Sequence, residues 1–221
     1  MSDLQDRIAG LKARIIRACE AGGRDAGSVE LLPVSKKQPL DLVDGAAALG
    51  FARFGENYVQ EGAEKSAARP ALAFTLIGPL QRNKAKAALL AFTELQSVDR
   101  VELVERLARL AEELDLNRGV WVQLDLWNEA TKVGGCAEAN LPTLLSAIRA
   151  APRLELKGLM AIPPPEDADA FPRLARLRDG LQQRLGQPLR LSMGMSGDLE
   201  AAIAAGSDQV RIGTAFFGER S

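Results

Sequence analysis

The 221-residue sequence predicts an α/β fold, a single (β/α)8 barrel (TIM barrel) that forms one domain over residues 1–221. Short apolar runs typical of buried strands alternate with longer stretches of helical periodicity. Eight such runs occur, and their alternation with helices implies parallel strands, because a parallel neighbour needs a long crossover. An open doubly wound sheet is the competing architecture, but the GxGxxG loop that usually follows its first strand is absent.

A helix over residues 3–22 opens the chain, because Leu4, Ile8, Leu11 and Ile15 share one face of it. The eighth predicted strand ends a few residues before the C-terminus, so we expect no helix after it. The N-terminal helix is therefore expected to complete the outer ring of helices.

The remaining elements follow in strict alternation. Strands are expected near residues 31–35, 51–54, 73–77, 94–98, 120–126, 156–161, 189–193 and 209–212. Helices are expected near residues 39–49, 57–68, 80–91, 100–115, 140–150, 168–185 and 197–205. The helix at 100–115 has the clearest periodicity, and Asp99 with Glu102 is expected to form a capping box at its start.

The composition is that of an ordinary globular protein, with 47% hydrophobic and 26% charged residues. The formal net charge of −1 argues against broad binding to nucleic acid or to an anionic membrane. No apolar stretch approaches the length of a membrane span, and the N-terminus lacks the apolar core of a signal peptide. We therefore expect a cytoplasmic protein with neither nucleic acid nor membrane among its partners.

The chain contains no histidine, which excludes Ser-His-Asp and Cys-His triads and histidine metal sites. Cys19 and Cys136 form neither a CxxC motif nor a ligand cluster, so we expect reduced thiols and no metal. Any catalysis must use Lys, Cys, Asp, Glu, Tyr or Arg, or a bound cofactor.

Lys36 ends the first predicted strand, at the rim where barrel enzymes place their working residues. Partial desolvation there lowers the pKa of an amine and favours its nucleophilic form, which suits a Schiff base with an aldehyde. The alternative is a solvated loop charge beside Lys37.

Ser196 precedes a predicted short helix, where a serine is an N-cap and where an anion also binds. Gly213 and Thr214 follow the last strand, and barrels of this type often hold phosphate in the loops after strands seven and eight. The alternative for Gly213 is a simple turn glycine.

Arg211 lies within an apolar run, so its charge needs a partner, either a structural carboxylate or a ligand atom. The polar residues at 125–132 follow the fifth strand and are either a solvated loop or a rim contact.

Five segments covering nearly the whole chain together resemble the pyridoxal phosphate homeostasis protein family. They are LLPVSKKQP (31–39), FGENYVQE (54–61), LIGPLQRNK (76–84), GLMAIPP (158–164) and LSMGMSGDLEAAIAAGSDQVRIGTAFFGER (191–220). That family is related to the N-terminal domain of alanine racemase, a fold-type III barrel.

The resemblance implies that pyridoxal 5′-phosphate is held by Lys36, Asn57, Ser196, Arg211, Gly213 and Thr214. Lys36 would carry the Schiff base and Asn57 would line the ring side. Ser196, Gly213 and Thr214 would hold the phosphate. Arg211 would face the pyridine nitrogen, where a cation disfavours protonation and weakens the cofactor as an electron sink.

Two positions depart from the family pattern: Thr75 stands where a histidine is common, and Asp125 where an asparagine is usual. The racemase's second domain, which supplies a catalytic tyrosine, has no counterpart, and Tyr58 is the single tyrosine. We therefore expect a monomeric carrier that maintains vitamin B6 and amino-acid homeostasis and transiently meets apoenzymes. The alternatives are a fold-type III amino-acid racemase and a barrel that binds nucleotide or sugar phosphate without a covalent bond.

Overall fold

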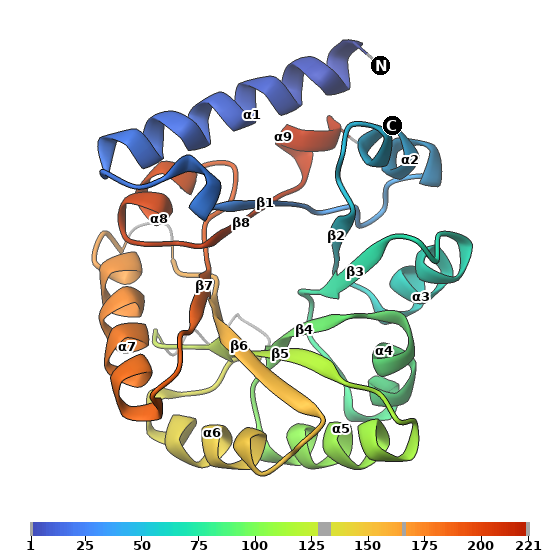
Figure 1. Ribbon diagram of the computed structural model, residues 1–221, viewed down its shortest axis with the longest axis vertical. Helices are drawn as coiled ribbons and strands as arrows, with labels where there is room; N and C mark the ends of the chain where they lie inside the picture. Colours follow the sequence, from blue (N-terminus) through green and yellow to red (C-terminus); the bar gives the residue numbers. More distant parts are fainter. Residues whose placement is uncertain (1, 128–133, 165–166, 220–221) are drawn as a thin grey trace.

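The computed structural model describes residues 2–127, 134–164 and 167–219. Their strands form one parallel sheet in the order β1-β8-β7-β6-β5-β4-β3-β2, which is a ring seen from above (Figure 1). The strands are β1 (Glu30–Pro33), β2 (Arg53–Glu56), β3 (Ala73–Leu76), β4 (Glu94–Val98), β5 (Arg118–Leu124), β6 (Leu154–Ala161), β7 (Arg190–Ser192) and β8 (Gln209–Ile212).

The two ends of this sheet meet at the rim. An isolated parallel bridge joins Val34, just after β1, to Gly55 of β2. The N–H of Ser35 donates to the carbonyl of Gly55 at 2.9 Å. The ring is thereby closed as a (β/α)8 barrel, which confirms the predicted fold class and excludes the open doubly wound sheet.

Helices surround the strands on the outside (Figure 1). They are α1 (Ser2–Ala21), α2 (Leu40–Ala48), α3 (Val59–Ala68), α4 (Ala85–Ala91), α5 (Val101–Glu113), α6 (Leu141–Arg149), α7 (Ala170–Leu185), α8 (Leu199–Ala204) and α9 (Thr214–Phe217). Most of them bury an apolar stripe; on α5 the buried residues include Leu103, Leu107 and Leu110. Burial of these stripes is what holds the helix layer against the barrel.

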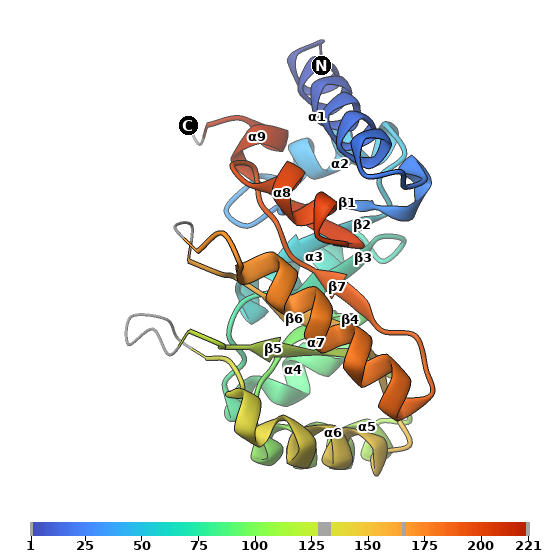
Figure 2. The ribbon, with the colours of Figure 1, turned by 90° about the vertical axis from the view of Figure 1, so that its left-hand side faces the viewer.

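The short helix α9 corrects the expectation that no helix follows the last strand. It forms because Phe216 and Phe217 bury their rings, while Gly213 and Gly218 bound the single turn. The N-terminal helix α1 lies beside α8 and α9 (Figure 2), and its Arg7 donates to the backbone carbonyls of Phe216 and Phe217. The last place in the ring is thus filled by α1 and α9 together.

Two local predictions are wrong for identifiable reasons. The second strand begins two residues later than predicted, because Phe51 still bonds the helix end at Ala46 and packs edge-on against Phe216, with ring centroids 4.9 Å apart. The capping box predicted from Asp99 does not form. Its carboxylate instead accepts the N–H of Gly135 at 3.1 Å.

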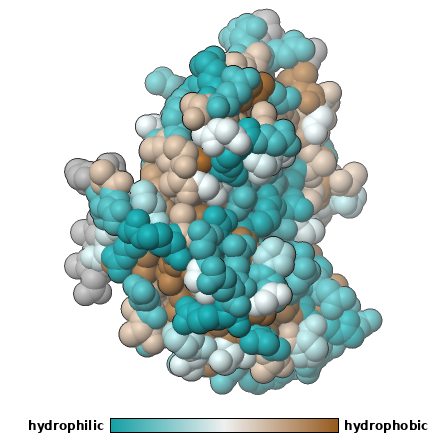
Figure 3. Space-filling model, turned by 60° about the vertical axis from the view of Figure 1, so that its left-hand side comes forward, coloured by the Kyte–Doolittle hydropathy of each residue, from teal (hydrophilic) through white to brown (hydrophobic). Residues whose placement is uncertain are grey.

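Cys19 and Cys136 are both buried and free, as predicted. Of the polar segment predicted at 125–132, residues 128–132 lie outside the described part of the chain. Asp125 is half-buried, and its carboxylate accepts the N–H of Trp127 at 3.2 Å. No helix in the described ranges is long and apolar enough to cross a membrane, and hydrophilic residues cover most of the face in Figure 3.

Candidate functional site

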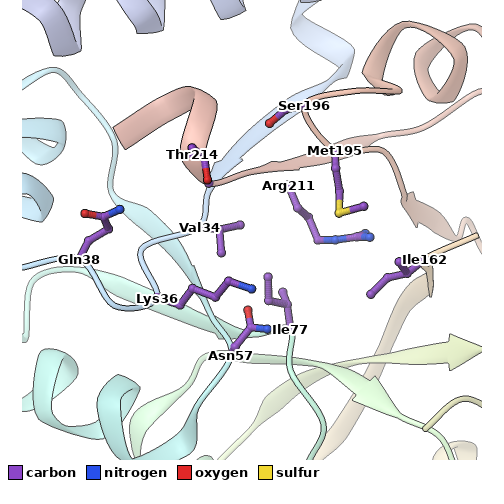
Figure 4. A pocket seen from close by; sticks show the side chains of 11 residues that line it. Val34, Lys36, Gln38, Asn57, Ile77, Ile162, Met195, Ser196, Arg211 and Thr214 are labelled. Carbon is purple, nitrogen blue, oxygen red and sulfur yellow. The ribbon is translucent and has the colours of Figure 1, made fainter. Parts of the chain in front are cut away.

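A cavity of about 270 Å³ opens at the carboxyl ends of the strands, where barrel enzymes hold their substrates. It contains all six residues predicted for the cofactor site. The lining residues are Val34, Lys36, Gln38, Asn57, Ile77, Ile162, Met195, Ser196, Arg211, Gly213 and Thr214. They come from segments far apart in the sequence, and Figure 4 shows them converging on one space.

Lys36 is half-buried and follows β1, with its side chain directed into the cavity (Figure 4). The next residue, Lys37, is exposed, and its ammonium lies 6.0 Å from the centre of the Tyr58 ring, outside this cavity. Of the two neighbouring lysines, Lys36 is therefore the one that a ligand in the cavity would meet.

Arg211 is buried and reaches the cavity from β8. Its guanidinium donates to the carbonyl of Ser192 at 2.5 Å, to the Ser192 hydroxyl at 2.8 Å and to the carbonyl of Ala161 at 2.9 Å. These partners are neutral, so neither of the two predicted partners, a carboxylate or a ligand atom, is needed to hold the side chain. Burial lowers the pKa of Arg211 to about 10, which leaves it charged at neutral pH.

The interior of the barrel fixes the direction of Arg211. The Ser192 hydroxyl lies 2.8 Å from Oε1 of Gln96, and Gln96 donates to Gln209 at 2.6 Å. All three side chains are fully buried. The carbonyl of Gly194 accepts the backbone N–H of Arg211 at 3.0 Å. The φ of Gly194 is 97°, which favours glycine, and a Cβ there would lie 2.6 Å from Ala202.

Ser196 lies at the cavity but is not the N-cap of α8, which corrects the sequence prediction. Asp198 occupies the cap position, and its carboxylate accepts the N–H of Met195 at 2.5 Å. This tight turn leaves the half-buried Ser196 side chain facing the cavity. Arg14 of α1 supports the turn by donating to the Ser196 carbonyl at 3.0 Å while pairing with Glu200 at 2.6 Å.

Gly213 and Thr214 lie at the start of α9, and no side chain caps this turn. The amide N–H groups of a first turn have no partner within the helix, so an anionic ligand would satisfy them. In Figure 4 Ser196 and Thr214 lie on the side of the cavity away from Asn57. The cavity thus has a hydroxyl- and amide-rich end that suits a phosphate.

Asn57 follows β2 and presents a side-chain oxygen that is buried without a hydrogen-bond partner. An unpartnered buried polar atom at a cavity is a sign that a ligand completes it. Gly78 makes this position possible, because a Cβ there would lie 2.1 Å from the Asn57 backbone oxygen. The residues present therefore fit a small ligand that combines a polar ring, an aldehyde and a phosphate.

Sequence reasoning missed five lining residues: Val34, Gln38, Ile77, Ile162 and Met195. Most are apolar residues at strand ends, which look like ordinary core. Strand alternation is the signal that places Ile77 on the inward face.

Three residues singled out from the sequence lie away from the cavity. Thr75 is fully buried, and Asp125 is half-buried; neither lines it. Tyr58 is 50% exposed and lines a neighbouring groove. The ionisable lining residues in the described ranges are thus Lys36 and Arg211. No cluster of potential metal ligands occurs among the described residues.

Comparisons with known proteins agree with this geometry. The family model described as alanine racemase, N-terminal domain, matches residues 14–221. The pyridoxal phosphate homeostasis protein of Pseudomonas aeruginosa is 46% identical over 227 residues, covering 100% of this chain and 97% of the relative. The protein of the same name from Escherichia coli K12 is 40% identical, with coverage of 100% and 98%.

Solved structures give the same picture. PipY of Synechococcus elongatus, solved with PLP bound, is 34% identical with a TM-score of 0.85, covering 97% of this chain and 100% of PipY. Alanine racemase of Clostridium difficile shares the fold at a TM-score of 0.76 and 13% identity; the match covers 100% of this chain and 57% of the racemase.

Proposed function

We propose that this chain, which belongs to the pyridoxal phosphate homeostasis protein family and has the barrel of the alanine racemase N-terminal domain, binds pyridoxal 5′-phosphate as a Schiff base on Lys36. It thereby takes part in intracellular vitamin B6 and amino-acid homeostasis. The observation that carries the proposal is the convergence of a half-buried lysine, a buried arginine and a hydroxyl- and amide-rich end in one cavity.

Each residue has a distinct task in this proposal. The cofactor supplies an aldehyde: a C=N bond forms between its carbon and Nζ of Lys36, and the aldehyde oxygen leaves as water. Asn57 lines the ring, and Arg211 places its cation toward the pyridine nitrogen. Ser196, Gly213 and Thr214 hold the phosphate.

We favour a carrier over an amino-acid racemase. Racemisation needs an acid or base on each face of the α-carbon. The described lining offers Lys36 for one face, while Ile162 and Met195 add apolar surface. The guanidinium of Arg211 is held by hydrogen bonds to Ser192 and to the carbonyl of Ala161, so it is not placed to serve as the second acid or base. Deuterium exchange at the α-carbon of alanine or serine, abolished by Lys36→Ala, would instead support the racemase.

The absorbance spectrum of the reconstituted protein, with and without borohydride, tests the linkage. We expect a visible band that borohydride removes and a reduced adduct that peptide mass mapping places on Lys36. Lys36→Ala should abolish it, and the matched variant Lys37→Ala should retain it. An adduct on another lysine would refute the assignment, and colourless phosphate binding that survives Lys36→Ala would favour the non-covalent barrel.

We also propose that residues 1–221 act as one barrel domain, as a cytoplasmic monomer that transiently meets apoenzymes. The support is that a single chain supplies every group of the cavity described above. Light scattering on the loaded protein tests the monomer, and a stable dimer would contradict it.

A further inference from the structure

A buried ionic cluster lies behind the Lys36 segment, between the barrel wall and α3. Lys65 of α3 is 6% exposed, although lysines almost never lie buried without partners. Its ammonium donates to the backbone carbonyl of Ser35 at 2.5 Å. It also donates to a carboxylate oxygen of Glu56 and to one of Glu61, each at 2.8 Å. All three of its protons are thus used.

The same two carboxylates hold both chain neighbours of Lys36. The Ser35 hydroxyl donates to the fully buried carboxylate of Glu56 at 2.6 Å. The N–H of Lys37 donates to Glu61 at 2.5 Å. Lys37 has a φ of 57°, a left-handed conformation that is uncommon for a residue with a side chain. The backbone around Lys36 therefore adopts an uncommon conformation, and hydrogen bonds to Glu61 of α3 and Glu56 of β2 maintain it.

The cluster also reaches a second segment of the cavity lining, because Glu56 directly precedes Asn57, which lies beside Lys36 in Figure 4. One buried ammonium thus joins the segment that carries Lys36 to the segment that carries Asn57. We propose that Lys65 is a positioning residue, which fixes these two segments so that Lys36 reaches the bound aldehyde. This role rests on the proposed Schiff base and adds a residue that does not touch the cavity.

A purely stabilising role explains the cluster less well. A buried ion pair is a weak stabiliser, since apolar replacements of similar volume are often neutral or better. What apolar side chains cannot replace is the set of directed bonds to the Ser35 carbonyl and the Lys37 N–H.

The test separates covalent capture from binding. Pyridoxal phosphate forms the borohydride-trapped adduct, while pyridoxine 5′-phosphate has the same ring and phosphate but no aldehyde. The variants are Glu61→Ala, its matched control Glu64→Ala on the same helix, and the charge-balanced double variant Glu56→Gln/Lys65→Met. Glu64 accepts a bond from Gln60 and does not line the cavity.

We expect Glu61→Ala and the double variant to slow adduct formation on Lys36 by at least about tenfold, since a small misplacement of a reacting group costs up to about 100-fold. The affinity for pyridoxine phosphate should fall much less, by at most about threefold, because only its ring contact at Asn57 depends on the cluster. Ser196, Gly213 and Thr214 hold its phosphate at the other end of the cavity. Glu64→Ala should match the wild type in both measurements. If circular dichroism shows that the double variant is unfolded, the Glu61 and Glu64 pair decides alone.

Two results would overturn the role of Lys65. One is a wild-type rate of adduct formation in Glu61→Ala and in any folded double variant. The other is a parallel loss of adduct and of pyridoxine phosphate binding, which would show general damage to the fold. Absence of an adduct in the wild type would instead refute the proposed Schiff base itself, so the two failures are distinguishable.

Discussion

Thr75 offers a test of whether a buried polar group without a hydrogen-bond partner destabilises the barrel. It is fully buried in β3, and its hydroxyl has no hydrogen-bond partner among the described residues. Leaving a buried hydroxyl unpartnered costs about 1–3 kcal/mol, and valine has nearly the same shape without the polar atom. Thr75→Val should therefore raise the free energy of unfolding by roughly 1–2 kcal/mol. For a chain of this size, each kcal/mol corresponds to about 2–4 °C in Tm.

Urea titration and thermal melting measure this change, with Thr75→Ser as the control. Serine keeps the hydroxyl and loses a buried methyl group, so it should cost about 1 kcal/mol. Adduct formation on Lys36 should be unaffected by either variant, because Thr75 lies two residues before Ile77 and does not line the cavity. A valine variant less stable than the wild type would refute the reasoning, since it would show that the hydroxyl has a partner.

Three further outcomes are expected. Ser192→Ala removes a hydroxyl that is hydrogen-bonded to Arg211. It should lower the free energy of unfolding, measured by urea titration, by about 1–3 kcal/mol. It should also weaken pyridoxal phosphate binding, measured by absorbance titration. Cys19 and Cys136 should resist a thiol reagent at neutral pH until urea unfolds the chain, because burial raises both pKa values, that of Cys136 to about 11; rapid labelling of the native protein would contradict this. Gly78→Ala places a methyl group against backbone and should reduce both the Tm and the yield of adduct, whereas unchanged values would show that the strand end yields easily.

The alternation of apolar runs and helical segments was enough to predict the barrel, because each run must pair with a parallel neighbour to be buried. The six site residues were predicted from the resemblance to the pyridoxal phosphate homeostasis protein family, and the barrel explains why they lie together. The carboxyl ends of all strands meet at one rim, so residues such as Lys36 and Arg211, distant in the sequence, were expected to converge there. The structure brings all six to one cavity.

The features that the sequence did not predict depend on how the helices and strands pack against one another. Glu61 and Lys65 are four residues apart on a helix, a spacing typical of an exposed surface pair. Only the packing of α3 against β2 and β3 buries Lys65 and turns it toward the Ser35 carbonyl. The neutral partners of Arg211 were hidden in the same way, because backbone carbonyls carry no sequence signal.

Glu56 gives the fold a pH dependence whose sign follows from its burial. Desolvation raises the pKa of its carboxyl above the ordinary value of 4.5, and the nearby charge of Glu61 acts in the same direction. Hydrogen bonds from Lys65 and Ser35 oppose the shift without cancelling it. Between the pKa of the unfolded chain and the raised pKa, the folded protein therefore binds more protons.

The contribution of Glu56 to stability is thus fully present below a pH of about 4.5, and it is lost as the pH rises through the pKa of the folded state. Glu56→Gln cannot titrate at this position, so it provides the reference. The free energy of unfolding of the wild type minus that of the variant should fall across this window, as measured by urea titrations at a series of pH values. A difference that grows with pH would mean that the ammonium of Lys65 outweighs desolvation, and that the carboxylate is held in its charged form more strongly than its burial implies.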